Sequence, residues 1–169
     1  PNTVEQVVSI HVKDINDNAP VFTGGASKDL TLNEGSTEIY QAVATDNDKT
    51  AANNTITYSL NQNSNDLFTI NANSGQVSLA AGKILDYEAL SDPNLTIKIG
   101  ASDGLNTVEQ VVSIHVKDIN DNAPVFTGGA SKELNLNEGS TKIYQAVATD
   151  NRSEEHTSEL QSHLNLVCR

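Results

Sequence analysis

The chain has 169 residues, enough for about one to one and a half domains of ordinary size. Its 22 acidic and 10 basic residues give a formal net charge of −12, whereas proteins that bind nucleic acid or anionic membranes carry basic patches. One cysteine, Cys168, leaves no possibility of a disulfide within the chain, and no apolar run is long enough to span a bilayer. The composition therefore argues against a nucleic-acid partner and membrane insertion. It favours either a protein that collects cations or a plain acidic surface.

Short strands are predicted wherever apolar residues alternate with polar ones along the chain. The first covers residues 8–12, and the clearest covers residues 95–101. Four shorter candidates lie between them, at 39–45, 55–60, 67–71 and 76–80. Turns rich in Asn, Gly and Ser separate these segments, and no amphipathic helix is expected before residue 153. Six or seven short strands in about 100 residues are typical of a sandwich of two antiparallel sheets.

An internal repeat sets the domain organisation. Residues 106–151 repeat residues 2–47 at 43 of 46 positions, at an offset of 104 residues. Only three positions differ: Asp29 becomes Glu133, Thr31 becomes Asn135 and Glu38 becomes Lys142. A period of this length matches a whole domain and is too long for a solenoid unit. The chain is therefore expected to hold one complete domain and the start of a near-identical copy.

Oxygen-bearing side chains recur where strands should end. They lie at Glu34, at Asp46–Asp48, at Asp86–Glu88, at Asp103, and in the segment 14–18 with its copy 118–122. Calcium prefers six to eight oxygen ligands, which Asp, Asn and Glu in loops supply. Any one of these groups alone is more often a turn than an ion site. An EF-hand is excluded, because the sixth and twelfth positions counted from Asp14 are Ala19 and Gly25.

The motifs DINDNAPVF, ATDND, LDYE and ASDG, taken together with their spacing, resemble the cadherin repeat over residues 2–151. The resemblance implies a seven-stranded Greek-key β-sandwich of the immunoglobulin-like, cadherin type, present in tandem. It places the end of one repeat and a linker at 1–18, a complete domain at 19–122 and the start of the next repeat at 123–151. The resemblance also implies calcium ions between successive domains, which stiffen the array.

The resemblance further implies which residues hold calcium at two junctions. At the second junction the implied ligands are Glu34, Asp86, Glu88, Asp118 and Asp121, with Asp150 for a shared second ion and Asn120 and Asn122 as linker counterparts of Asn16 and Asn18. Arg152 stands where a second carboxylate is expected beside Asp150. At the first junction the implied ligands are Asn16, the Asn18 carbonyl, Asp46, Asp48, the Asn53 carbonyl and Asp103. Asp14 and Asp17 belong to this junction too, where the preceding domain would complete the set.

The last residues, 152–169, differ in character from the rest of the chain. They hold both arginines and the single cysteine, and they resemble a translated sequencing-library adapter, whose first codons encode Arg-Ser-Glu-Glu-His. A zinc site at His156, His163 and Cys168 lacks a close ligand pair. We therefore assign no function to this tail.

Neither an enzyme nor a sugar-binding platform is favoured by the remaining residues. No G-x-S-x-G, P-loop or H-E-x-x-H motif occurs. Asp86 and Glu88 could be a glycosidase pair, but their place beside an Asp-rich linker favours metal ligands. His11 and His115, the same position in two copies, are expected on the surface, and no tryptophan is available for sugar stacking.

The expected function is calcium-dependent adhesion by a tandem array at the cell surface or outside the cell. Near-identical copies without cysteines favour a bacterial adhesin. The neighbouring repeats of the same chain are the expected partners, with another surface protein or a polysaccharide as a further partner. The alternative is a carbohydrate- or protein-binding module of a secreted or surface protein.

Overall fold

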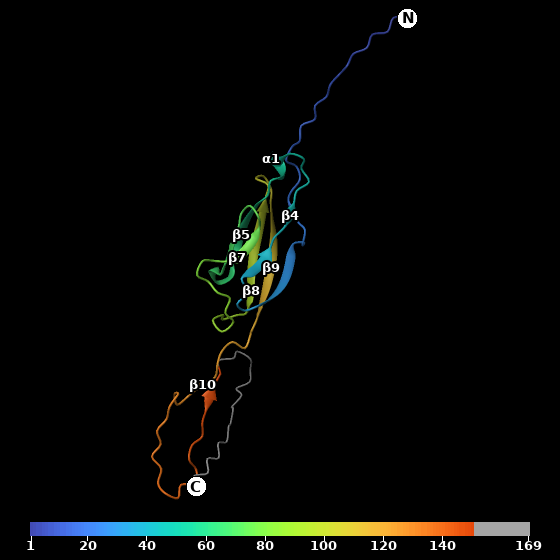
Figure 1. The fold of residues 1–169 in the computed structure, drawn as a ribbon. Coiled ribbons are helices and arrows are strands. Elements are labelled where there is room, and N and C mark those ends of the chain that lie inside the picture. Colours follow the sequence, from blue (N-terminus) through green and yellow to red (C-terminus); the bar gives the residue numbers. More distant parts are fainter. Residues whose placement is uncertain (151–169) are drawn as a thin grey trace. The chain divides into compact units, whose positions relative to one another are not determined.

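The computed structural model describes residues 1–150, which form two compact units. The first unit comprises residues 1–85 and 92–117, and the second comprises residues 86–91 and the chain from residue 118 onward. The predicted tail at 152–169 lies outside the described residues. Figure 1 shows the strands of the first unit arranged as two facing layers.

The first unit is a β-sandwich of a four-stranded and a three-stranded sheet. The larger sheet has the order β2-β9-β8-β5 and the smaller one β3-β7-β6, while β1 pairs with β4 as a separate ladder. The strands are β1 (Val21–Phe22), β2 (Ser27–Asn33), β3 (Glu38–Gln41), β4 (Ala44–Thr45), β5 (Thr57–Asn63), β6 (Phe68–Ile70), β7 (Gln76–Leu79), β8 (Asn94–Ser102) and β9 (Thr107–Lys117). Two single turns of helix, α1 (Ala51–Asn54) and η1 (Ser64–Asp66), flank β5.

The alternation of the sequence decides which side chains enter the core. Along β8, Leu95, Ile97 and Ile99 are buried, while the residues between them are partly exposed. β9 pairs with β8 so that Ile97 lies opposite Val112 and Leu95 opposite Ile114. Each of these apolar side chains is at most 2 % exposed, as expected for a strand with one face on the core.

Two expectations from the sequence need correction. The sandwich was expected to contain antiparallel sheets, but β2 runs parallel to β9, with Leu30 opposite Ile114. The alternation at Leu30 and Leu32 does not reveal which strand pairs with β2 or in which direction it runs. The two paired strands, β2 and β9, are separated by most of the domain's sequence. The strand expected at 39–45 is also divided into β3 and β4, which belong to different sheets.

The strand expected at 8–12 does not form. Residues 1–20 carry no strand, and Val8, Ile10 and Val12 are 68 %, 82 % and 91 % exposed. The same sequence in the second copy is β9, whose neighbours are β2 and β8. Among the described residues, β2 and β8 pair with the second copy and not with the first, so the apolar side chains of the first copy stay exposed.

The second unit repeats the first ladder of the sandwich. β10 (Val125–Phe126) pairs with β11 (Ala148–Thr149) in the register that β1 and β4 use, with Val125 opposite Thr149 as Val21 is opposite Thr45. The hydrogen bond from Thr23 N to the Val43 carbonyl also recurs, from Thr127 N to the Val147 carbonyl. Near-identical sequence therefore gives the same local pairing in both copies.

Candidate metal centres

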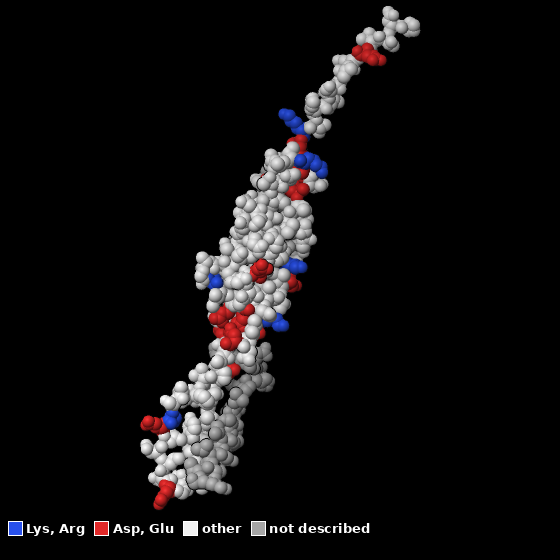
Figure 2. Space-filling view, viewed as in Figure 1, with Lys and Arg blue, Asp and Glu red and all other residues white. Residues whose placement is uncertain are grey.

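Three carboxylates of the first unit converge at one end of the sandwich. Asp46 and Asp48 follow β4, and Asp103 follows β8, so two separate loops bring them together. Each offers a carboxylate oxygen, and these three oxygens lie within 4.8 Å of one another. Asp48 and Asp103 are buried, with 5 % and 7 % of their surface exposed. Figure 2 shows mostly uncharged residues over the middle of the sandwich.

The linker that precedes the domain is attached to this cluster. The Asn18 side-chain Nδ2 donates a hydrogen bond to Asp48 Oδ1 at 2.6 Å. The backbone N–H of Asn18 makes a longer bond of 3.4 Å to Asp48 Oδ2. The Asp46 carboxylate is in turn held by the backbone N–H of Asp48, which donates to Asp46 Oδ1 at 2.9 Å. The cluster thus joins the linker to the loop after β4.

The chemistry of this cluster fits a hard divalent cation. Asp46 Oδ2 is buried and accepts no hydrogen bond from any described residue. A buried carboxylate oxygen without a donor is unfavourable, and three carboxylates this close repel one another. A calcium ion bound by these oxygens would remove both costs.

Asp103 is held as a carboxylate by its own turn. Burial alone would raise the pKa of Asp103, but hydrogen bonds outweigh it and hold the pKa below the ordinary value of 3.8. The donors are the backbone N–H groups of Asn106 and Leu105, at 2.6 and 2.7 Å from Oδ1, and the Asn106 side chain. The side chain is therefore ionised, the form that binds a metal, across the physiological pH range.

Asn106 is a contributor to this site that sequence reasoning missed. Its Nδ2 donates to three oxygens: Asn16 Oδ1 at 3.4 Å, the Asn18 carbonyl at 3.3 Å and Asp103 Oδ2 at 3.2 Å. All three acceptors belong to the ligands expected at the first junction. The only signal in the sequence is its position three residues after Asp103, in the turn that leads into β9.

Three other residues expected at the first junction lie outside the carboxylate cluster. Asp14 Oδ2 accepts hydrogen bonds from the loop before α1 and from Asn53 Nδ2, the latter at 2.9 Å. Asp17 Oδ1 accepts a bond from the neighbouring Asn18 side chain at 3.0 Å. The structure thus brings Asp14 and Asn53 together, but through a direct hydrogen bond between their side chains.

The second unit holds most of the residues expected at the second junction. The carboxylate oxygens of Glu88 and Asp121 lie within 4.8 Å of each other. Asp121 Oδ1 accepts a bond from Asn122 Nδ2 at 2.9 Å, and Asp86 Oδ1 accepts one from Ala89 N at 3.2 Å. Asp118, Asn120 and Asp150 also belong to this unit. Glu34 belongs to the first unit, where its side chain is 6 % exposed and its backbone N–H donates to the Lys117 carbonyl at 3.0 Å.

With this geometry established, comparison with known proteins identifies the family. The family model described as "Cadherin domain" matches residues 28–117, more than half of the chain. The chain belongs to the cadherin family. Its β-sandwich is that of a cadherin domain.

The relatives of this cadherin chain are very large proteins. It is 36 % identical to mouse protocadherin Fat 4 over 159 residues, covering 89 % of this chain and 3 % of that protein. It is 34 % identical to human cadherin-23 over 163 residues, covering 90 % of this chain and 5 % of that protein. The crystal structure of human CDH23 EC21-23 matches with a TM-score of 0.64 and 28 % identity, covering 83 % of this chain and 46 % of that one. The chain thus spans a small part of the curated relatives it matches.

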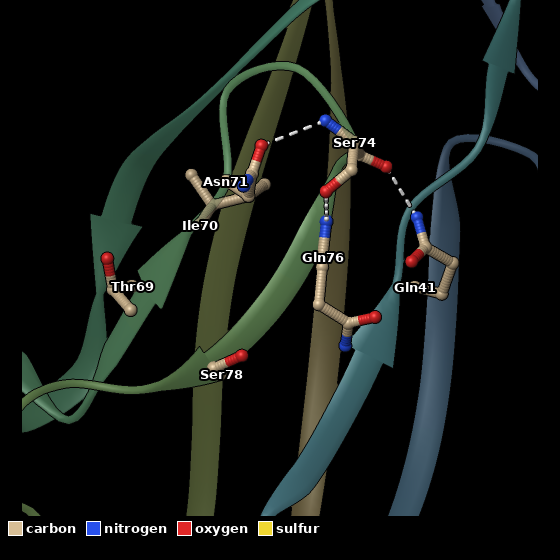
Figure 3. Close-up of a pocket in the computed structure, with 7 residues that line it drawn as sticks. All are labelled: Gln41, Thr69, Ile70, Asn71, Ser74, Gln76 and Ser78. Atoms are coloured by element: carbon tan, nitrogen blue, oxygen red, sulfur yellow. Dashed lines mark hydrogen bonds between the residues drawn. The ribbon is translucent and has the colours of Figure 1, made fainter.

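A shallow hollow on the smaller sheet is a candidate binding site for a carbohydrate or protein ligand. It is lined by uncharged residues, Gln41, Thr69, Ile70, Asn71, Ser74, Gln76 and Ser78 (Figure 3). Most of its amide groups already have partners, since Gln41 Nε2 donates to the carbonyls of Ala42 and Ser74, and Asn71 Oδ1 accepts from two backbone N–H groups. The hollow has no aromatic side chain, so it offers little for sugar stacking.

In the part of the chain that the structure describes, no helix is long and apolar enough to cross a bilayer.

Proposed function

We propose that this cadherin chain is part of an extracellular, tandem-repeat adhesion protein in which calcium at the domain junctions stiffens the array. The observation that carries the proposal is the attachment of linker residue Asn18 to Asp48, within a cluster of three carboxylates. An ion held there binds the linker and two loops of the domain at the same time. The chain's role is mechanical, and its acidic residues are ligands with no catalytic part.

At the first junction, the ligands are contributed by two loops and the linker. They are the carboxylates of Asp46, Asp48 and Asp103, the side-chain oxygen of Asn16 and the carbonyl of Asn18. Oxygen atoms of this kind suit calcium, which accepts an irregular set of carboxylates, amides and carbonyls. The ion supplies positive charge to three carboxylates, and the protein's part is to hold them in place. The Asn53 carbonyl belongs to the same proposed set, and Asp14 and Asp17 complete the junction when a preceding repeat is present.

At the second junction, Asp86, Glu88, Asp118 and Asp121 act with Glu34. Two hydrogen bonds of the first unit support a ligand role for Glu34: its own N–H bonds to the Lys117 carbonyl, and Gly35 N bonds to the Leu85 carbonyl at 2.7 Å. Lys117 and Leu85 immediately precede Asp118 and Asp86 in the chain. The backbone of residues 34 and 35 therefore bonds to the residue that precedes each acidic segment in the chain. Asn120, Asn122 and Asp150 extend this set toward the next repeat.

The proposed array consists of a complete domain at 19–122 and the start of the next repeat at 123–151, and each domain's partners are the neighbouring repeats. Extracellular calcium modules bind at roughly 10⁻⁴–10⁻³ M. At tenfold excess over the dissociation constant, each ion adds about 1.4 kcal/mol to the free energy of unfolding. Several ions therefore contribute an amount comparable with the whole margin of a small domain, which is about 5–15 kcal/mol.

Thermal unfolding with and without calcium tests the proposal. We expect the melting temperature of the chain to rise in millimolar calcium relative to EDTA, and to rise less in magnesium, which demands a regular octahedral site. Asp103→Asn should reduce the rise, because it removes one carboxylate charge while keeping an oxygen for the turn. Asp92→Asn is the matched control, since Asp92 is exposed and bonds only within its own loop, to Asn94 at 2.8 and 2.9 Å. A melting temperature that calcium leaves unchanged would show that the carboxylates are solvated turns, and glycan-array binding by the chain would then favour the binding-module alternative.

A further inference from the structure

At the first junction, the Asn106 carboxamide bonds to the linker and to the domain at the same time. A single nitrogen, Nδ2, donates to a linker side chain, a linker carbonyl and a domain carboxylate: Asn16 Oδ1, the Asn18 carbonyl and Asp103 Oδ2. The three distances are 3.2–3.4 Å, so one NH2 group, with its two hydrogens, contacts all three oxygens. Asn16 and Asn18 lie 90 and 88 residues before Asn106 in the chain, whereas Asp103 lies three residues before it.

The backbone of Asn106 is fixed by the turn that it closes. Its carbonyl accepts hydrogen bonds from Asp103 N at 3.2 Å and from Ser102 Oγ at 3.0 Å, and its N–H donates to Asp103 Oδ1 at 2.6 Å. Asn106 is half-buried and lies directly before β9, the longest strand of the larger sheet. Because the turn already fixes the backbone, the contacts of the side chain cost only its own rotamer entropy. The three bonds of Nδ2 are therefore made from a preformed position.

A metal site gains affinity when outer groups hold its ligands in place before the ion arrives. Donors that bond to ligating oxygens orient them, and removing such a partner typically weakens metal binding about 10–100-fold. Asn106 is well suited to this role because its amide N–H groups can bond to oxygen atoms, whereas a further carboxylate at this point would repel Asp103.

We propose that Asn106 is a positioning residue of the first-junction calcium site, which holds Asn16, the Asn18 carbonyl and Asp103 together before the ion binds. This inference rests on the proposed function, because it assigns a role at the same site. It makes the donor capacity of Asn106, rather than its oxygen, the property that matters. It also makes linker docking and calcium affinity depend on one side chain.

The test measures how the melting temperature depends on calcium concentration in the full chain. Glu88→Gln and Asp121→Asn are introduced first, so that the response comes from the first junction. In this background we compare Asn106→Ala and Asn106→Asp, with Asn61→Ala as a control. Asn61 is an exposed asparagine of β5 whose Nδ2 donates to Glu109 Oε1 at 2.8 Å, a residue that is not among the expected ligands. The two readouts are the metal-free melting temperature and the calcium concentration that gives half of the maximal rise.

We expect both Asn106 variants to raise the half-maximal calcium concentration about tenfold or more, and Asn61→Ala to leave it unchanged. Asn106→Asp, which cannot donate, should also melt at a lower temperature than its parent without metal. An unchanged calcium response in Asn106→Ala would overturn the positioning role of Asn106 but would leave the proposed function standing. A response lost in Asn106→Ala but kept in Asn106→Asp would also overturn it, by showing that Asn106 ligates the ion through oxygen. A parent chain that does not respond to calcium would overturn the proposed function itself.

Discussion

Asp14 and Thr50 are joined by two hydrogen bonds that need no metal. Asp14 Oδ2 accepts one bond from Thr50 N at 3.0 Å and another from Thr50 Oγ1 at 2.9 Å. The same oxygen accepts Lys49 N at 3.2 Å and Asn53 Nδ2 at 2.9 Å. These bonds lower the pKa of Asp14 below 3.8, and the bond from the Thr50 hydroxyl has the largest effect. Burial acts in the opposite direction. The linker is thus attached to the domain through Asp14 as well as through Asn16 and Asn18, which bond to Asn106 and Asp48.

Replacing Asp14 by alanine should release the loop before α1 even in the absence of calcium. The backbone N–H groups of Lys49 and Thr50 lose their acceptor, so their amide hydrogen exchange should accelerate, as measured by NMR or mass spectrometry. Asp17→Ala is the matched control, because Asp17 lies in the same linker but accepts a bond only from the adjacent Asn18 side chain. Equal exchange rates at positions 49 and 50 in the two variants would refute a docking role for Asp14.

The lowered pKa values of Asp14 and Asp103 predict how stability without metal depends on pH. A carboxylate whose pKa is lower in the folded state stabilises the fold above its unfolded pKa, and this contribution is lost as the pH falls through the folded pKa. With an ordinary value of 3.8, the melting temperature of the metal-free chain should be insensitive to these groups near neutral pH and fall below about pH 4. Melting curves in metal-free buffers across this range measure the effect.

A double variant, Asp14→Asn with Asp103→Asn, is the control for the acid response. The variant has no titrating group at either position, so its loss of stability between about pH 4 and pH 3 should be smaller than that of the parent. A loss equal to that of the parent would show that other carboxylates govern acid unfolding.

Much of the fold was predictable because the repeat and the alternation both carry local information. The strands at 95–101, 55–60, 67–71 and 76–80 were predicted and correspond to β8, β5, β6 and β7, with ends that differ by a few residues. The cadherin family was predicted from four acidic motifs and is confirmed by the family model over residues 28–117. The division of 39–45 between two sheets was not predictable, because a change of sheet leaves no mark on the alternation.

The carboxylates of the candidate site were also predictable, while their hydrogen-bond partners were not. Asp46, Asp48 and Asp103 follow strands, and the structure brings the three together. The contacts of Asn106 and Asp14 depend on how the linker passes over the loops, which sequence spacing does not encode. Whether any of the expected residues is a ligand stays a prediction.

The two copies of the sequence VVSIHVKD provide a test of tertiary context. Ile114 in β9 has no exposed surface, and Ile10, the same position in the first copy, is 82 % exposed. Ile114→Ala should lower the free energy of unfolding by about 2–5 kcal/mol, because it leaves a cavity in the core. Ile10→Ala should change it by less than about 0.5 kcal/mol. Urea denaturation of both variants measures the difference, and a similar cost at the two positions would contradict the exposure of the first copy.

Comparing Gly75 with Gly82 distinguishes two reasons why a turn requires glycine: a positive φ, and the lack of space for a Cβ. Both have positive φ, of +73° and +74°, so an alanine at either position is strained by about 1–2 kcal/mol. A Cβ at Gly75 would also lie 2.5 Å from the Ala42 carbonyl oxygen and 3.2 Å from the Tyr58 ring, whereas at Gly82 it would meet nothing within 4 Å. Gly75 N further donates to the Asn71 carbonyl, and its own carbonyl accepts a bond from Ala42 N, so the backbone cannot move away freely. Gly75→Ala should therefore destabilise the domain clearly more than Gly82→Ala in urea denaturation, and equal losses would mean that the left-handed conformation alone demands glycine at both turns.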